Sequence, residues 1–342
     1  MEFRTYVLRR VILLFFILLG VSILVFVLAV MVPSDPAYLW SGSQVPNEQE
    51  LEQIREQYHL RDPWYVQYLW YLWRILHGDL GTSPVRRVPV ATELMTYLPP
   101  SVELGTFALL LSIAIGLPIG IISATRKDTA WDHAGRLLAL GQVSLPAFWI
   151  GLIFQLVFYY NLRLVADPGG FVSDAVLSAH PLTRITGFMT IDSLLTGNWA
   201  VLASALQHLV LPGLVMSFYS TALIARISRA SMMEAMNQDY IRTARAFGLS
   251  ERVVIYKLAL KNALIPTTTA IGLAVGWLLT GSVVVETIFY WPGIGRFAVD
   301  SIQNFDFPGL IGFVLLAGLI YGVANVIVDV VYGFLDPRIR QG

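Results

Sequence analysis

The sequence predicts an all-α integral membrane protein, and its composition and the length of its apolar stretches both indicate this class. The chain has 342 residues, of which 56% are hydrophobic and 13% charged, and its mean hydropathy is +0.64. Soluble domains carry about 25% charged residues. Six uncharged apolar stretches are long enough to cross a bilayer, which takes about 20 helical residues. Their length favours helices over the short alternating strands of an outer-membrane barrel.

We expect six transmembrane helices, because a helix satisfies its own backbone hydrogen-bonding groups within one span. Arg9 and Arg10 precede the first stretch, as they would in a secretion signal. Its apolar core is too long for a signal, however, and no small-residue cleavage site follows. The predicted spans are Val11–Val32, Leu104–Thr125, Leu137–Leu162, a stretch within Ser193–Ala225, Asn262–Val285 and Phe307–Val328.

The distribution of charge predicts which side each connecting segment faces. If the N-terminus is inside, the inner segments are 1–10, 126–136, 226–261 and 329–342. They hold 15 Lys and Arg against 8 Asp and Glu, whereas the outer segments hold 8 against 15. Positive charge concentrates on the cytoplasmic side of membrane proteins. We therefore expect both termini in the cytoplasm.

Several kinds of chemistry find no support in the sequence. Lys and Arg together number 23, as do Asp and Glu, so no excess of positive charge indicates a nucleic-acid partner. The chain has no cysteine, which excludes disulfides, thiol catalysis and cysteine-based metal sites. No lysine follows a glycine, no histidine is followed by glutamate, and no Gly-x-Ser-x-Gly occurs. We expect no catalytic residue, cofactor or metal in this chain.

The first outer segment is expected to be helical and to lie at the membrane surface. Apolar residues at Leu51, Ile54 and Tyr58 follow helical spacing, and Asp62-Pro63 then interrupts the helix. The aromatic run after it suits a membrane–water boundary or a docking surface for an outer partner. It comprises Trp64, Tyr65, Tyr68, Trp70, Tyr71 and Trp73. We divide the chain into residues 1–100, with the first span and this segment, and a five-span core, 101–342.

The second outer segment, about Arg163–Asp192, is mixed in polarity. Asp167-Pro168-Gly169-Gly170 predicts a turn there.

The inner segment Arg226–Lys261 is the most informative connection, because its 36 residues far exceed a simple helix–helix loop. Asp239 is expected to cap a short helix, Tyr240–Phe247, that Gly248 ends, and Ser250 to cap a second helix. A basic segment could bind anionic lipid headgroups, but the apolar residues at this tip favour a protein partner. The expected docking segment is Asp239, Tyr240, Ile241, Arg242, Thr243, Ala244, Arg245, Ala246, Phe247, Gly248 and Leu249. A charge placed on it by Ala244→Glu is expected to uncouple this segment from its partner without unfolding the spans.

Polar residues within the spans are candidates for the transport path or for a helix interface, because they are costly in lipid. Asn325 and Asp329 share one helix face, and Asp329 either ends its helix by pairing with Arg338 or Arg340 or binds a proton or ion. His208 suits an interface hydrogen bond or a proton relay. The candidates are Gln155, Gln207, His208, Asn325 and Asp329.

Six motifs, in order along nearly the whole chain, resemble ATP-binding-cassette (ABC) importer permeases. The branch is the one for dipeptides, oligopeptides and nickel, and the resemblance is to the first of its two permeases. Arg242-Thr243-Ala244 replaces the Glu-Ala-Ala of the general importer loop, which is the form usual in this branch. The motifs lie in Arg9–Ala37 (RR, GVSILVF, PSDPA), Leu60–Gly81 (RDP, VQYLW, GDLG), Ser144–Gly151 (SLPAFWIG), Ser231–Pro266 (the coupling loop), Val283–Gly295 (VVVETIFYWPGIG) and Leu335–Arg340 (LDPRIR).

The resemblance implies half of a translocation path in a prokaryotic plasma (inner) membrane. A second homologous permease would complete the path, and two cytosolic ABC ATPase subunits would hold ATP and Mg. An extracytoplasmic binding protein would deliver di- or oligopeptides, or alternatively oligosaccharides, nickel or another small solute. The coupling loop 226–265 would dock on an ATPase subunit, and Trp291, Pro292, Gly293, Ile294 and Gly295 would form a loop at the outer mouth. An ion-coupled secondary transporter is the competing class, and a purely structural membrane protein is a third.

Overall fold

The protein is built from helices. The computed structural model describes residues 3–31, 36–41, 47–165 and 167–335. Within these ranges no strand forms beyond an isolated bridge between Thr82 and Pro89. The predicted all-α membrane fold is confirmed.

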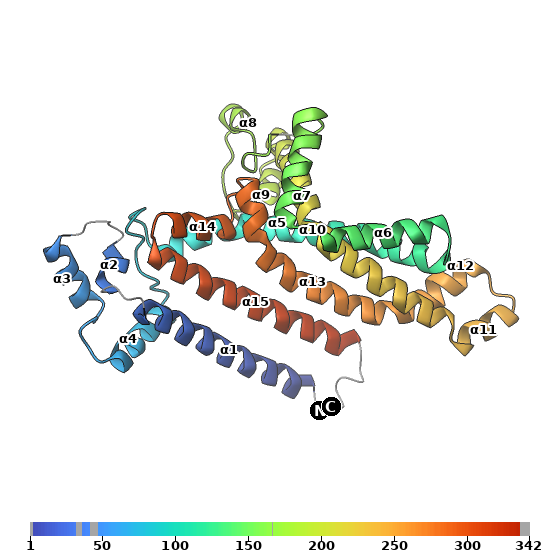
Figure 1. Ribbon diagram of the computed structural model, residues 1–342, viewed down its shortest axis with the longest axis horizontal. Coiled ribbons are helices and arrows are strands. Elements are labelled where there is room, and N and C mark those ends of the chain that lie inside the picture. Colours follow the sequence, from blue (N-terminus) through green and yellow to red (C-terminus); the bar gives the residue numbers. More distant parts are fainter. Residues whose placement is uncertain (1–2, 32–35, 42–46, 166, 336–342) are drawn as a thin grey trace.

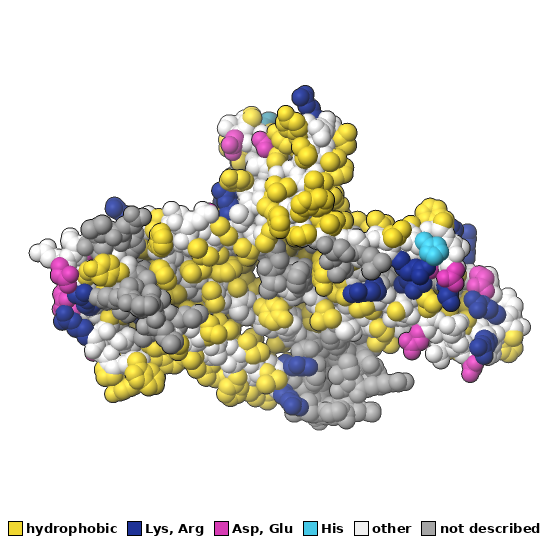
Figure 2. All heavy atoms as spheres, in the orientation of Figure 1, with side chains coloured by type: hydrophobic (Ala, Val, Ile, Leu, Met, Phe, Trp, Pro, Cys, Tyr) yellow, Lys and Arg dark blue, Asp and Glu magenta, His cyan; other side chains and the backbone are white. Residues whose placement is uncertain are grey.

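Long helices that run alongside one another form the body of the molecule (Figure 1). Five stretches of the described residues are long and apolar enough to cross a membrane. Hydrophobic side chains cover much of the middle of the body, and charged ones gather near its two ends, over α3 and over α11 and α12 (Figure 2). The long helices are α1 (Phe3–Met31), α5 (Val90–Thr125), α10 (Trp199–Met236), α13 (Leu260–Ile288) and α15 (Phe307–Leu335).

The third predicted span is divided in the structure. Instead of one helix over Leu137–Leu162, α6 (Ala130–Ser144) is followed by α7 (Ala147–Phe154) and a π-helical segment, η1 (Gln155–Asn161). Leu145 and Pro146 between them are extended, because the residue before a proline avoids helical geometry. α7 turns away from the long helices (Figure 1). The helix proposed for this span is therefore interrupted at Pro146.

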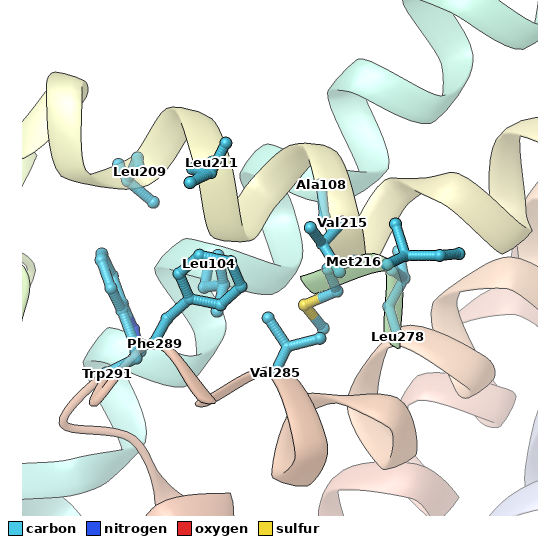
Figure 3. Packing of buried hydrophobic residues seen from close by; sticks show 11 residues of the cluster. Leu104, Ala108, Leu209, Leu211, Val215, Met216, Leu278, Val285, Phe289 and Trp291 are labelled. Carbon is cyan, nitrogen blue, oxygen red and sulfur yellow. The ribbon is translucent and has the colours of Figure 1, made fainter. Parts of the chain in front are cut away.

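α5 and α10 form the centre of the body and approach each other closely. A Cβ atom at Gly116 or Gly120 would collide with backbone carbonyls of α10, so these two small residues permit the contact. Towards one end, side chains of α5, α10 and α13 converge on a buried core (Figure 3). This core includes Leu104, Ala108, Leu209, Leu211, Val215, Met216, Leu278, Val285, Phe289 and Trp291.

Short helices lie at the ends of the body and beside it. α2 (Pro36–Ser41), α3 (Glu48–Gln57), α4 (Trp64–Leu76) and α14 (Ile294–Gln303) occupy one end, and α8 (Asp174–Ala179) and α9 (Met189–Leu195) project with α7 (Figure 1). The predicted helix around Leu51 and Ile54 and the interruption at Asp62-Pro63 are both confirmed. The boundary drawn at residue 100 falls within α5. The opposite end carries the inner segment between α10 and α13.

Candidate functional site

The inner segment contains a short helix, α11 (Asp239–Ala246), which is separated from the end of α10 by two residues. Gly248 ends α11 with a φ of +76°. The Gly248 amide donates to the Arg245 carbonyl at 2.9 Å, and the Leu249 amide donates to the Ala244 carbonyl at 3.2 Å. This pair of bonds is the Schellman arrangement, in which glycine is favoured at the left-handed position. The predicted stop at Gly248 is confirmed.

The start of α11 differs from the prediction. The N-cap is Gln238, whose side chain makes no capping bond, and Asp239 is the first helical residue rather than the cap. A carboxylate in the first turn still interacts favourably with the helix dipole. Ser250 does occupy the N-cap of α12 (Glu251–Val253), but without a side-chain bond.

α11 has one face inside the protein and one face in contact with its surroundings. Ile241 is 0% exposed and Ala244 is 7% exposed, and both pack on a core with Met232, Ala235 and Val254. Phe247, at the helix end, is 83% exposed. An aromatic side chain left this open at the tip of a projecting segment is a strong candidate for a contact with another subunit.

This arrangement corrects the expected role of Ala244. The sequence suggests that the apolar residues from Ile241 to Leu249 form one outer surface, but Ile241 and Ala244 face inwards. A charge at Ala244 would be placed in the protein core and would act on folding rather than on docking. The exposed residues of the segment are Asp239, Tyr240, Arg242, Thr243, Arg245, Ala246, Phe247, Gly248 and Leu249.

The docking segment is attached to the long helices on both sides. After α12, a π-helical segment η2 (Val254–Ala259) continues directly into α13. Arg245 binds Glu251 through two bonds, at 2.8 and 3.2 Å, across the Gly248 turn. The side-chain amide of Asn262 donates to the Tyr240 hydroxyl at 2.9 Å. A force applied to α11 would therefore reach both α10 and α13 (Figure 1).

Near the same end, a buried ion pair fixes the start of α6 to α10. The Asp132 side chain is fully buried and accepts from Arg229 Nε at 2.7 Å and Nη2 at 2.9 Å. The Asp128 amide also donates to it at 3.1 Å. The Arg229 hydrogen bonds lower the pKa of Asp132 to about 2, although burial alone would raise it.

Neutralising this carboxylate by Asp132→Asn is expected to destabilise the protein by about 1–3 kcal/mol at neutral pH. The folded pKa lies below the ordinary value of 3.8, so the contribution is fully present above that value and is lost as pH falls towards 2. The difference in thermal stability between the wild type and Asp132→Asn should stay the same between pH 7 and 5 and should shrink below about pH 4. A difference that grew on acidification would contradict this origin. The exposed neighbour Asp128 provides the control, Asp128→Asn.

At the opposite end, Glu286 organises the loop that joins α13 to α14. It is fully buried, and its carboxylate accepts from Ser101 Oγ at 2.6 Å and from the Gly295 and Arg296 amides at 2.7 and 3.2 Å. Ser101 Oγ in turn accepts from the Ile294 amide at 2.8 Å. We call Glu286, Ser101 and these three amides the Glu286 cluster. It caps the start of α14 and ties α14 to α5 and α13.

The Trp291–Gly295 loop is therefore packed inside the protein. Trp291 is buried, and its indole nitrogen donates to the Pro100 carbonyl at 2.9 Å. Gly293 and Gly295 allow neighbouring groups to approach this loop closely. A Cβ at Gly293 would collide with the Glu286 carboxylate, and one at Gly295 with the backbone of Val283. That this loop lies at the outer mouth of a translocation path stays a prediction.

The polar residues of the spans do not form one chain. Gln155 Nε2 donates to the Ile288 carbonyl at 3.1 Å, which joins η1 to the end of α13. Gln207 and the buried His208 line one cavity. Asn325 is exposed on α15, and the side chain of Asp329 lies outside the described part of the structure.

Two buried carboxylates hold the segment between η1 and α10. Glu103 of α5 accepts from the Met189 and Thr190 amides, at 3.1 and 2.8 Å, and so caps α9. Asp192 accepts from three amides at residues 185–187 and from the Thr186 hydroxyl.

In the same segment, Asp167 accepts from the Gly169 amide at 3.0 Å, and Gly170 has a φ of +85°. The predicted turn at Asp167–Gly170 is confirmed.

The sequence pattern does not reveal the roles of Glu103, Asp132, Glu286 and Arg229. Each was counted only as a charge in or beside a connecting segment, since its partners lie far away in the sequence. For Glu286 a signal existed: the acid stands beside an uncharged apolar stretch and precedes a Pro-Gly loop. Such an acid needs several donors if it is to remain buried.

Long apolar helices, with the short helix α11 at one end and the buried Trp291–Gly295 loop at the other, define a multi-pass membrane protein. The chain belongs to the binding-protein-dependent transport system inner membrane component family, whose model matches residues 116–341. The N-terminal model of such membrane components matches residues 3–92.

Named relatives extend over nearly the whole chain. The probable D,D-dipeptide transport system permease protein DdpB of Escherichia coli (strain K12) is 43% identical over 94% of both chains. The dipeptide transport system permease protein DppB of the same strain is 39% identical over 98% of both. The oligopeptide transport system permease protein AppB of Bacillus subtilis (strain 168) is 36% identical over 98% of this chain and 99% of its own. The predicted family is confirmed.

Proposed function

We propose that this chain is one half of the transmembrane path of an ABC importer for di- or oligopeptides. The observation that carries the proposal is near full-length similarity, at 36–43% identity, to permeases named for dipeptide and oligopeptide transport. The exposed tip of α11 supports it independently, because a path that used an ion gradient would need no such docking element. The substrate remains the finer part of the proposal, with oligosaccharides, nickel or another solute as the alternative.

In this proposal the exposed face of α11 lies in a cleft of one ATPase subunit, which holds ATP and Mg. Closure of the two ATPase subunits would push α11 and move α10 and α13, to which it is fixed on both sides. The path would then alternate between an outward and an inward opening, as a rigid-body change. The buried contacts of Ile241 and Ala244 make α11 move with these helices rather than bend away from them.

The proposal also sets the orientation. The ends of α1 and α15 that lie nearest the chain termini point towards the α11 side (Figure 1). With α11 inside, both termini are cytoplasmic, in agreement with 15 basic against 8 acidic residues in the inner segments. The binding protein would then meet the end that carries α2–α4 and α14. A second permease would complete the path in a heterodimer, and the exposed apolar side chains of α1 suit lipid.

Co-purification and uptake test this function together. The tagged chain, extracted in mild detergent, is expected to bring down a second permease and ABC ATPase chains. Cells that make the whole system should accumulate labelled Ala-Ala only while ATP is available, and the purified complex should hydrolyse ATP faster with the binding protein. Peptide uptake that survives ATP depletion, with the chain recovered alone, would contradict the importer and favour the ion-coupled class.

A further inference from the structure

A cavity of about 500 Å³ lies between the first turns of α10 and the segment that contains α8. Its volume falls in the range of small-molecule sites, which is about 300–1,000 Å³. Its polar lining residues are Asp167, Ser173, Asp174, Ser204, Gln207 and His208. Figure 2 shows acidic side chains on the α8 side of the projecting part and hydrophobic ones on the α7 side.

The walls of this cavity are fixed by packing. Val172 and Met189 of the connecting segment form a buried core with Val201 and Ala205 of α10. The Ser173 amide also donates to Ser204 Oγ at 3.1 Å. The loop is therefore held on α10 by contacts within the protein itself, and these contacts give the cavity its shape.

His208 gives the cavity a directed acceptor. The side chain is only 5% exposed, and its Nδ1 lies 2.7 Å from the Ser204 carbonyl. A carbonyl oxygen only accepts, so Nδ1 must donate, and in the neutral ring Nε2 carries the lone pair. No group among the described residues bonds to Nε2. His208 lines the cavity, so its Nε2 is open to a hydrogen bond from a ligand.

The charge of the lining defines the ligand. Asp167 and Asp174 contribute two carboxylates, and neither Lys nor Arg lines the cavity. One oxygen of Asp167 accepts from Gly169, which leaves the other for a ligand. Carboxylates and a histidine lone pair are all acceptors, so together they favour a cationic group with several N–H donors.

We propose that this cavity binds the α-ammonium group of a peptide as it enters the path. The inference rests on the proposed function, because it takes the peptide as the solute and this end of α10 as the outer one. A free α-ammonium is common to D- and L-dipeptides and to longer peptides. The cavity would hold this shared group and leave the choice of side chains to the binding protein.

Weak binding to the assembled complex tests the proposal without the binding protein. Saturation-transfer NMR would compare Ala-Ala with N-acetyl-Ala-Ala, which lacks the ammonium charge, on the nucleotide-free complex. Ala-Ala is expected to bind more tightly. In the double variant Asp167→Asn with Asp174→Asn its affinity should fall by about three- to ten-fold, the range of two exposed ion pairs. The affinity for N-acetyl-Ala-Ala should stay the same, and Glu56→Gln on α3 is the matched control for loss of an exposed carboxylate.

Equal affinity of the two probes for the wild type would overturn the proposal, and that comparison requires no variant to fold. Unchanged affinity for Ala-Ala in the double variant would also overturn it. Uptake by cells separates this failure from a failure of the proposed function. If the wild type imports Ala-Ala while either binding result is negative, only the ammonium site is wrong. If the wild type imports no peptide, the proposed function fails, and the site fails with it.

Discussion

Replacing Phe247 by aspartate is expected to separate this chain from its ATPase partners while leaving its helices folded. Phe247 is 83% exposed at the end of α11 and makes no contribution to the buried core of the inner segment. Large exposed aromatic residues commonly dominate a protein interface, at about 2 kcal/mol or more each. ATPase co-purification and ATP-driven uptake should therefore fall at least about ten-fold, which corresponds to 1.4 kcal/mol.

The chain offers a matched control for this variant. Phe305 is 61% exposed at the opposite end, in the turn between α14 and α15, and Phe305→Asp should retain the ATPase subunits. Ile241→Ala, on the buried face of α11, should lower thermal stability because it leaves a cavity, at about 2–5 kcal/mol. Equal retention of ATPase by Phe247→Asp and the wild type would show that α11 docks through another surface, or not at all.

Removing the Glu286 carboxylate by Glu286→Ala is expected to have a large effect on stability, at the end of the molecule opposite to α11. It would leave the Ser101 hydroxyl and the amides of Gly295 and Arg296 without their buried acceptor. A buried group left without its partner costs about 1–3 kcal/mol, so the total should reach at least about 3 kcal/mol. In detergent, where unfolding is commonly irreversible, the midpoint of thermal aggregation should fall by about 5–10 °C.

The control for Glu286 lies on the helix that it caps. Asp300 of α14 has a partly exposed side chain 3.8 Å from Arg296, and Asp300→Asn should leave the midpoint within about 1 °C. Ser101→Ala should have an intermediate effect, since it removes one donor to Glu286 and the acceptor for the Ile294 amide. An unchanged midpoint in Glu286→Ala would mean that the cluster does not hold α14 in place.

The membrane fold was predictable because long apolar runs have few alternatives in a bilayer. Composition and span length predict the long helices, and the ability of Gly248 to adopt a positive φ predicts the end of α11. The third span was predicted as one helix because Pro146 lies within an otherwise apolar stretch. A single proline hardly changes the hydropathy of such a stretch, but it does restrict the backbone geometry there.

The segment expected to dock could be located in the sequence, but which side of α11 faces the partner could not. α11 has only eight residues, with apolar side chains on both of its sides, so their spacing does not show which side meets the core. Burial of Ile241 and Ala244 depends on Met232 and Val254, which approach only after α10 and η2 have formed. The same limit applies to Glu286 and Ser101, which are 185 positions apart.

Photo-crosslinking from α11 tests the central claim most directly. With a photoreactive benzoyl-phenylalanine in place of Phe247, illumination of the assembled complex should join this chain to an ATPase subunit. The same residue in place of Phe305 should join it only to proteins on the outer side. Crosslinks from position 247 to lipid alone, or to an outer binding protein, would contradict the proposed docking and with it the mechanism of an ATP-driven importer.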